Sequence, residues 1–436
     1  MGIRVIGAGL AGCEAAYQIA ERGVAVELLE MKPQKMTPAH RRTSFCELIC
    51  SNSLKAARVE SAAGLLKEEM RRIGSLLMQC ADACAVPAGG ALAVDRDLFS
   101  DMVTQKIRSH PLITVTEQEV TVLPQEGVNV IATGPLTADT LAGQIVQRCG
   151  GSLHFFDAAA PIVTADSIDR AYAFTASRYD KGGDDAYINC PMNKEEYERF
   201  HAALVQAERA PRHDVDVQNP KVYEGCMPVE ILAQRGLDTL RFGPMKPVGL
   251  RDPKTGHRPW AVVQLRSENA AKTMYNLVGF QTNLKFPEQK RVFGMIPALH
   301  EAEYVRYGVM HRNTFLDSPR LLSADYAMRD DPNLFFAGQM TGVEGYMESA
   351  SSGMMAGINA VKRYRGEASV ILPPTTMIGA LSRYIADSTV KDFQPMGANL
   401  GILPPLPEVI RDKRQKAAAY AKRSLDDLTT VLDSLR

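Results

Sequence analysis

Two cysteines lie where a thiol could do chemistry. Cys226 sits in residues 223–228 (YEGCMP), a Gly/Pro-flanked loop within a basic stretch, where positive charge favours the thiolate. Cys50 sits in residues 48–53 (LICSNS), just before an Ala-rich helical stretch. Such thiols can add to an electron-poor carbon or move a proton. From position alone, an inert buried thiol is the more frequent role for Cys226, and the Ser-rich run around Cys50 also fits a helix cap.

The remaining cysteines indicate neither a disulfide scaffold nor a metal site. The chain has 8 cysteines in 436 residues, too few for a disulfide-stabilised fold of this length. The pairs Cys46/Cys50 and Cys80/Cys84 have three-residue spacers, and no neighbouring Cys or His completes a zinc site. We therefore expect no metal, a reducing compartment and a cytoplasmic protein.

A glycine-rich turn near the start of the chain predicts dinucleotide binding. Residues 3–9 read as a strand, 10–22 as a helix and 24–29 as a second strand, which together make one βαβ unit. The second strand closes on Glu30, 18 residues after the turn. The turn itself consists of Gly7-Ala8-Gly9-Leu10-Ala11-Gly12.

Each glycine of this turn has a physical role. Gly7 permits the tight turn, Gly9 lets the backbone approach a pyrophosphate, and Gly12 lets the helix pack close to the strand. The helix N-terminus then faces the phosphates, and Glu30 can accept hydrogen bonds from a ribose, which disfavours a 2′-phosphate there. A glycine-rich turn without a ligand is the structural alternative.

Later segments favour FAD over NAD. Residues 128–134 (VNVIATG) form a strand ending at Thr133 and Gly134, and residues 333–339 (NLFFAGQ) form one ending at Gly338 and Gln339. Two-domain flavoproteins place such strand ends beside the adenine and ribityl chain, usually with an Asp where Gln339 stands; an amide can still bind a ribityl hydroxyl. The small-residue helix 350–360, with Gly353, would direct its N-terminus at the flavin or simply pack closely against another helix.

Length and composition predict two packed units. The chain is 45% hydrophobic and 23% charged, an ordinary globular composition. The pattern changes to short strands and prolines between residues 187 and 324. We predict an α/β fold: a Rossmann-like FAD-binding domain of the two-domain flavoprotein type, made of residues 1–186 and 325–436, with a smaller α/β domain for substrate or tRNA inserted at 187–324.

The charge is balanced overall but not locally. The 50 basic and 50 acidic residues exclude a surface that is basic throughout. Residues 241–320 hold 13 Lys/Arg and 6 Asp/Glu, a local net charge of +7 that favours a polyanionic partner or, as the alternative, a solvated basic face. A basic helix after residue 404 extends this surface or only aids solubility. No run of 18 apolar residues occurs, so we expect no membrane partner.

Several longer motifs give the chain a family resemblance. The motifs at residues 36–40 (MTPAH), 47–54 (ELICSNSL), 224–230 (EGCMPVE), 242–247 (FGPMKP), 279–283 (GFQTN) and 308–313 (GVMHRN) accompany the glycine turn over nearly the whole chain. Together they resemble the bacterial methylenetetrahydrofolate- and FAD-dependent tRNA uracil-5-methyltransferases, which are similar to the larger flavoprotein of wobble-uridine modification. Cys46 and residues 298–300 (ALH) depart from the family pattern.

The resemblance implies a reaction and roles for both cysteines. A one-carbon unit passes from 5,10-methylenetetrahydrofolate to the T-loop uridine of tRNA, and FAD reduced by NADH or NADPH supplies the electrons. Cys226 adds to uracil C6, and Cys50 removes the C5 proton or handles the methylene group. The resemblance implies no obligate protein partner. A ribosomal RNA acceptor, a small-molecule flavin oxidoreductase and a noncatalytic RNA-binding flavoprotein remain alternatives.

Overall fold

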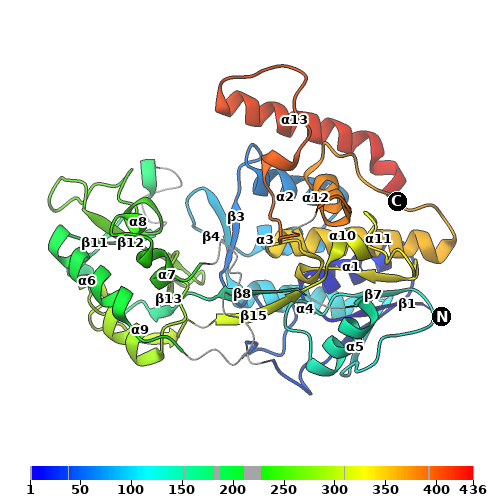
Figure 1. Cartoon of the computed structure of the whole chain (residues 1–436), viewed down its shortest axis with the longest axis horizontal. Coiled ribbons are helices and arrows are strands. Elements are labelled where there is room, and N and C mark those ends of the chain that lie inside the picture. Colours follow the sequence, from blue (N-terminus) through cyan, green and yellow to red (C-terminus); the bar gives the residue numbers. More distant parts are fainter. Residues whose placement is uncertain are drawn as a thin grey trace.

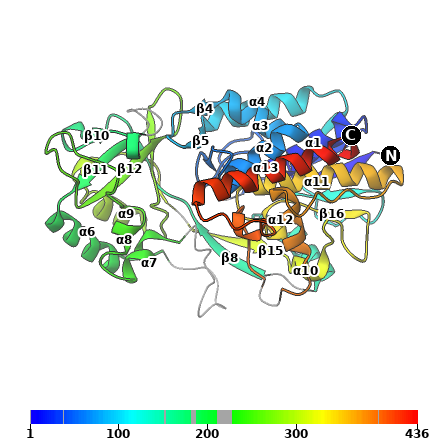
Figure 2. The ribbon, with the colours of Figure 1, turned by 90° about the horizontal axis from the view of Figure 1, so that it is seen from above.

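The computed structural model describes residues 2–37, 39–150, 153–180, 187–210, 227–308, 310–390 and 393–435. Figure 1 shows two lobes side by side, with both chain termini on the larger one. A parallel sheet forms the centre of the larger lobe, and an antiparallel sheet forms the centre of the smaller one. An antiparallel pair, β8 (Leu153–Ala158) and β15 (Met310–Phe315), lies between them (Figures 1 and 2).

The parallel sheet has five strands in the order β16-β7-β1-β2-β6. Every pairing in it is parallel, so all five carboxyl ends meet at one edge. Its strands are short and mostly buried, as expected of a sheet covered on both faces. Their bounds are β1 Ile3–Ile6, β2 Val26–Glu30, β6 Ile113–Glu117, β7 Asn129–Ile131 and β16 Leu334–Phe336.

Helices cover this sheet, and two of them make a close crossing. A Cβ on Gly353 of α11 (Tyr346–Arg365) would lie 2.1 Å from the carbonyl oxygen of Ala11 in α1 (Leu10–Glu21), and one on Gly357 would lie 2.6 Å from that of Ala15. The other helices of this lobe are α2 Ala62–Ile73, α3 Leu76–Ala83, α4 Arg96–Ser109, α5 Asp139–Cys149, α10 Ser318–Leu321, α12 Met377–Ala386 and α13 Lys413–Val431.

A three-stranded sheet, in the order β3-β5-β4, lies on the side of the larger lobe that faces the smaller one (Figure 1). Its strands are β3 Ser53–Ala56, β4 Ala85–Val86 and β5 Ala91–Val94. Since β3 begins three residues after Cys50, this sheet holds the C-terminal end of the cysteine segment.

The antiparallel sheet has six strands in the order β10-β11-β12-β13-β9-β14 and a hydrophobic core of its own, which runs from Val163 to Ala302. The strands are β9 Ile162–Thr164, β10 Phe174–Thr175, β11 Tyr187–Met192, β12 Ala261–Ser267, β13 Met274–Leu277 and β14 Tyr304–Arg306. The helices are α6 Lys194–Gln206, α7 Val229–Gln234, α8 Thr239–Phe242 and α9 Phe286–Phe293.

The predicted fold class is confirmed: a Rossmann-like α/β unit is joined to a smaller unit with its own sheet. The predicted βαβ unit appears as β1, α1 and β2, with Glu30 as the last residue of β2. The antiparallel sheet already includes β9 and β10, which precede residue 187, so it extends further toward the N-terminus than the predicted insertion. No helix in the described part of the chain is long and apolar enough to cross a membrane.

Candidate active site

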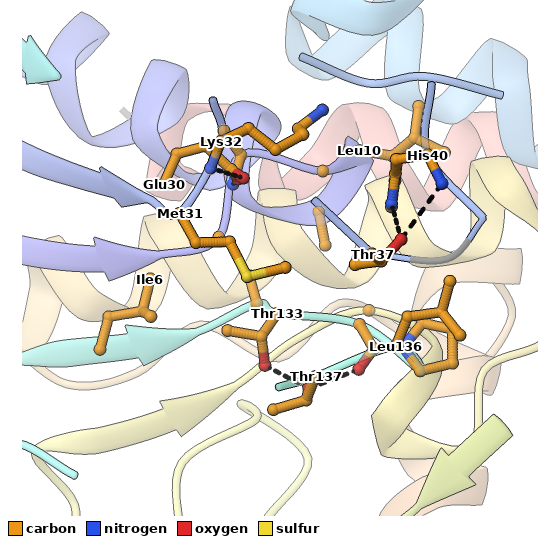
Figure 3. A pocket seen from close by; sticks show the side chains of 18 of the residues that line it. Ile6, Leu10, Glu30, Met31, Lys32, Thr37, His40, Thr133, Leu136 and Thr137 are labelled. Carbon is orange, nitrogen blue, oxygen red and sulfur yellow. Dashed lines mark hydrogen bonds between the residues drawn. The ribbon is translucent and has the colours of Figure 1, made fainter. Parts of the chain in front are cut away.

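A pocket that is partly open to solvent lies at the carboxyl ends of β1, β2, β7 and β16. In open parallel sheets this edge is where ligands bind, because loops and helix N-termini converge there. The pocket wall includes the glycine turn, the end of β2 and the loops after β7 and β16 (Figure 3). Of the predicted cofactor-binding residues, Gly7, Ala8, Gly9, Leu10, Ala11, Glu30, Thr133, Gly134, Gly338 and Gln339 line it.

The three glycines of the turn differ in what surrounds them. Gly7 has φ +99°, and a Cβ there would lie 2.7 Å from the Ala132 carbonyl oxygen. A Cβ on Gly12 would lie 1.7 Å from the Gly7 oxygen, so Gly12 serves packing and does not line the pocket. A Cβ on Gly9 would meet no atom within 4 Å, and Gly9 precedes a helix N-terminus that no side chain caps. The open position is therefore Gly9, where a phosphate would approach.

Glu30 is tied to the glycine turn. Its Oε2 accepts a hydrogen bond from the Ala8 N–H at 2.6 Å, and its Oε1 accepts one from the Lys32 N–H at 3.0 Å. Each carboxylate oxygen can accept a further bond, so the group stays able to bind a ribose hydroxyl. We therefore propose that Glu30 both fixes the turn and binds the ribose.

The loops after β7 and β16 line the opposite wall. The Thr133 and Thr137 hydroxyls lie 2.6 Å apart, and Thr137 donates to the Gly134 carbonyl at 2.7 Å (Figure 3). Gly338 has φ +86°, which favours glycine. The Gln339 amide donates to a Glu344 carboxylate oxygen at 2.6 Å, so that neighbour holds the amide that replaces the usual Asp.

Gly353 does not line the pocket. It lies about two turns inside α11, where it allows the close crossing with α1. Of the two roles expected for Gly353, close helix packing is therefore the one that its position fits. The N-terminus of the same helix does reach the pocket, through Tyr346 and Ser349. The expectation that this helix directs its N-terminus at the flavin therefore concerns its first turn and not Gly353.

Two further wall residues were given no role from the sequence. The Thr37 Oγ1 and His40 Nδ1 atoms lie 2.6 Å apart, and both side chains line the pocket (Figure 3). They belong to the motif at residues 36–40, but motif membership alone does not show which residues face a ligand. The tertiary fold supplies that information.

Cys50 lies on the pocket wall beside the start of α11. The backbone N–H groups of Cys50 and Ser51 donate to the Tyr346 hydroxyl at 2.7 and 3.2 Å. Burial raises the pKa of Tyr346 above its ordinary range, so the phenol stays neutral and can accept both bonds. Cys50 is half-buried, which leaves its segment accessible from the pocket.

Cys226 and residues 223–226 of its motif lie outside the described residues. The two departures from the family pattern are described. Cys46 is buried and lines the pocket, with its N–H donating to the Ala8 carbonyl at 3.1 Å. His300 is exposed and lies 2.8 Å, through Nδ1, from the Pro297 carbonyl oxygen.

Arginines hold the Cys50 segment from two sides. Arg266 of β12 donates to the Asn52 Oδ1 at 2.9 Å and to the Ser51 Oγ at 2.7 Å. Arg96, at the start of α4, donates to the Leu48 carbonyl at 2.5 Å and forms a salt bridge with Glu268, Nη2 to Oε2, at 2.6 Å. Because Arg266 and Glu268 come from the antiparallel sheet, these contacts join the two lobes directly at Cys50.

Four of the 13 basic residues at 241–320 are paired with acids in the described part of the chain. Arg241, Lys285, Arg291 and Arg320 form salt bridges of 2.5 to 3.1 Å with Asp238, Glu208, Glu288 and Asp317. Arg241 also lies 3.7 Å from the Trp260 ring centroid. Four exposed basic side chains for which the described residues show no salt bridge lie close together in sequence, in the segment that we call the basic loop: Lys246, Arg251, Lys254 and Arg258.

The residues present fit an adenine dinucleotide. The open position at Gly9, the uncapped N-terminus of α1 and the carboxylate at the end of β2 match the phosphates and the ribose. Within the described part of the chain, no group of three or more His, Cys, Asp and Glu side chains could hold a metal ion. The fold and the pocket together define a flavoprotein of the Rossmann-like, FAD-binding class.

Comparison with known proteins identifies the family. The model of the family described as glucose inhibited division protein A matches residues 2–368. Proteins named methylenetetrahydrofolate–tRNA-(uracil-5-)-methyltransferase TrmFO are 61% identical in Acetivibrio thermocellus, over 97% of each chain, and 55% identical in Enterococcus faecalis, over 99% of each. This chain belongs to that family, as the motif resemblance predicted, and is therefore FAD-dependent.

A solved structure shows the same fold at much lower identity. The Aquifex aeolicus GidA structure aligns with a TM-score of 0.72 at 15% identity, covering 100% of this chain and 73% of that one. A second crystal form of the same protein gives a TM-score of 0.69, covering 98% and 76%. At this identity the likeness concerns the fold alone.

Proposed function

We propose that this protein transfers a one-carbon unit from 5,10-methylenetetrahydrofolate to C5 of the T-loop uridine, position 54, of tRNA, giving 5-methyluridine. The observation that carries the proposal is the placement of the Cys50 segment on the wall of the dinucleotide pocket, in a chain 55–61% identical to enzymes of that name. We also propose that it acts in the cytoplasm.

Cys226 is the proposed nucleophile of the reaction. Uracil C5 becomes nucleophilic only when a group adds to C6 and turns the ring into an enolate, and a thiolate is suited to that addition. Cys50 then removes the C5 proton or handles the methylene group. The assignment of Cys226 rests on its motif alone, whereas that of Cys50 is also supported by its place beside the pocket.

The FAD site is proposed to comprise the glycine turn, Glu30 and the loops after β7 and β16. Gly9 and the start of α1 bind the pyrophosphate, Glu30 binds the ribose, and Gln339 binds the ribityl chain. When bound, FAD supplies the reducing equivalents, obtained from NADH or NADPH, that convert the methylene group into a methyl group. The first turn of α11 places its uncapped N–H groups near the same wall.

The tRNA is proposed to lie across both lobes, with its target base turned out of the T-loop toward Cys50. The basic loop supplies unpaired positive charge for the phosphates. The division into an FAD-binding domain and an inserted substrate domain remains part of this proposal, with the insertion extended to include β9 and β10.

The test is methylation of unmodified tRNA by the purified protein with methylenetetrahydrofolate, FAD and NADPH, followed by mapping of 5-methyluridine. We expect one modified T-loop uridine, and none with Cys226→Ala or without the folate. NADPH oxidation without methylated tRNA would contradict the tRNA assignment. Repeating the assay with ribosomal RNA, and then without RNA, separates the ribosomal acceptor from a small-molecule oxidoreductase.

A further inference from the structure

Arg306, the last residue of β14, is a nearly buried cation for which the described residues provide no partner. Its relative exposure is 9%. Among the described residues, no carboxylate forms a salt bridge with its guanidinium and no oxygen accepts a hydrogen bond from it. Strand β14 is an edge strand, paired only with β9, and Arg306 pairs there with Ile162. Burial lowers the pKa of Arg306, but an arginine stays protonated in proteins.

The backbone of the segment that contains Arg306 runs beside the pocket wall: a Cβ on Gly308, two residues further on, would lie 2.7 Å from the carbonyl oxygen of Ala159, which lines the pocket. Arg96, Tyr346, Arg41 and Glu47 are near enough to influence the pKa of Arg306. Tyr346 and Glu47 line the pocket, and the Tyr346 hydroxyl accepts the hydrogen bond from the Cys50 N–H. Arg306 therefore belongs to the antiparallel lobe but lies at the Cys50 end of the pocket.

The nearby carboxylates are already engaged. Glu268 forms its salt bridge with Arg96 at 2.6 Å, and an oxygen of Glu47 accepts hydrogen bonds from the backbone N–H groups of Arg41 and Arg42 at 3.0 and 3.1 Å. The third buried arginine, Arg266, binds neutral side chains. The region thus holds more positive than negative charge, and burying an unpaired charge is unfavourable unless a ligand compensates it.

The proposed reaction brings a matching negative charge to this place. The acceptor nucleotide carries a phosphate, and its pyrimidine becomes an enolate once C6 has been attacked. We propose that Arg306 binds an oxyanion of the acceptor nucleotide at the Cys50 end of the pocket. This inference rests on the proposed function, and it names a substrate-binding residue that neither the glycine turn nor the cysteine motifs contain.

The two sources of the oxyanion have different kinetic signatures. A phosphate is charged in the free substrate, so losing its partner weakens binding and raises KM for tRNA. The enolate forms only during the reaction, so losing its partner lowers kcat and leaves KM for tRNA unchanged. Loss of a charge-assisted hydrogen bond typically changes KM or kcat by about 10- to 100-fold.

The experiment compares Arg306→Gln, Arg306→Lys and Arg148→Gln in steady-state methylation, with tRNA and methylenetetrahydrofolate varied separately. Arg148 is the matched control because its salt bridge with Asp330 lies on α5, away from the pocket. We expect Arg306→Gln to lose about 10- to 100-fold through KM for tRNA or through kcat, Arg306→Lys to recover part of it, and the control to retain activity.

Other outcomes would overturn the inference. These are unchanged kinetics in Arg306→Gln, a rise confined to KM for methylenetetrahydrofolate, or loss of bound FAD and of thermal stability in both Arg306 variants. Wild-type protein that methylates no RNA would instead refute the proposed function, so the two failures are distinguishable.

Discussion

At the scale of single residues, the Cys50 segment is fixed by groups distant in sequence. The Tyr346 hydroxyl accepts from two of its N–H groups, Arg96 binds its Leu48 carbonyl, and Arg266 binds Asn52. Such an array fixes the backbone and the neighbouring side chains around the Cys50 thiol. The array also explains why the Ser/Asn-rich run is not simply a helix cap, since α2 is capped separately by Ser61.

Replacing Cys50 tests its role directly. We expect Cys50→Ala to abolish methyl transfer while the purified protein stays yellow, because the proposed FAD contacts are made by the glycine turn and Glu30 and not by Cys50. Tritium release from C5-labelled tRNA and flavin absorbance are the measurements. Cys149→Ala, which removes another half-buried thiol on α5, is the control and should remain active. Methylation by Cys50→Ala would remove this residue from the mechanism.

Arg266 is a positioning residue by this reasoning. Arg266→Lys keeps the charge but cannot bridge Asn52 and Ser51 together, so kcat should fall by about 10- to 100-fold with KM for tRNA and FAD content unchanged. Because the segment loosens, iodoacetamide should alkylate Cys50 at a different rate, measured by mass spectrometry. Lost activity with unchanged alkylation would argue against positioning.

At the scale of elements, sequence patterns predicted those helices and strands whose formation depends on neighbouring residues. The periodicity of residues 3–29 gave β1, α1 and β2 because strand, turn and helix preferences agree there. The sequence did not reveal the contact of Arg266 with Asn52, which are 214 residues apart, nor the salt bridges within the basic stretch. Those depend on tertiary packing, which composition and spacing do not encode.

The crossing of α1 and α11 should be intolerant of added volume. Gly353→Ala would place a methyl group 2.1 Å from the Ala11 carbonyl oxygen, so we expect about 1–3 kcal/mol of destabilisation and weaker FAD binding as α1 shifts. Gly143→Ala on α5 is the control, since its Cβ meets nothing within 4 Å; it should be neutral or slightly stabilising. Urea unfolding and FAD titration measure both. Equal stability of the two variants would contradict the packing role of Gly353.

At the scale of the whole molecule, one buried carboxyl joins distant parts of the chain. Glu69 of α2 accepts hydrogen bonds from the Met377 and Ile378 N–H groups, at the start of α12, at 2.7 and 2.9 Å. It also accepts one from the Ser424 hydroxyl of α13 at 2.5 Å. Burial raises the pKa of Glu69 to about 7 against these hydrogen bonds, which lower it.

The raised pKa of Glu69 predicts the pH dependence of stability. The folded protein holds the proton more tightly than the unfolded chain, so this contribution is present below pH 4.5 and is lost as the pH rises to about 7. The free energy of unfolding should fall by roughly 3 kcal/mol over that interval, and Glu69→Gln should remove this part of the slope. Urea unfolding at several pH values measures it, with exposed Glu60→Gln as control. An unchanged slope in Glu69→Gln would refute the assignment.

Because the net charge of the chain is zero, we expect electrostatic attraction of RNA to come from its local excess of positive charge. Paired cations such as Lys285 and Arg291 exchange one partner for another on binding, whereas the cations of the basic loop form no salt bridge within the described part of the chain. Replacing its four cations by Ala should weaken tRNA binding and lower the slope of log K against log salt by up to about 3, with kcat at saturating tRNA unchanged. The control is the double variant Lys285→Ala/Arg291→Ala, which should change the slope much less. Filter binding over a salt series measures both; an equal effect of the two variants would mean that net charge, rather than unpaired charge, attracts the RNA.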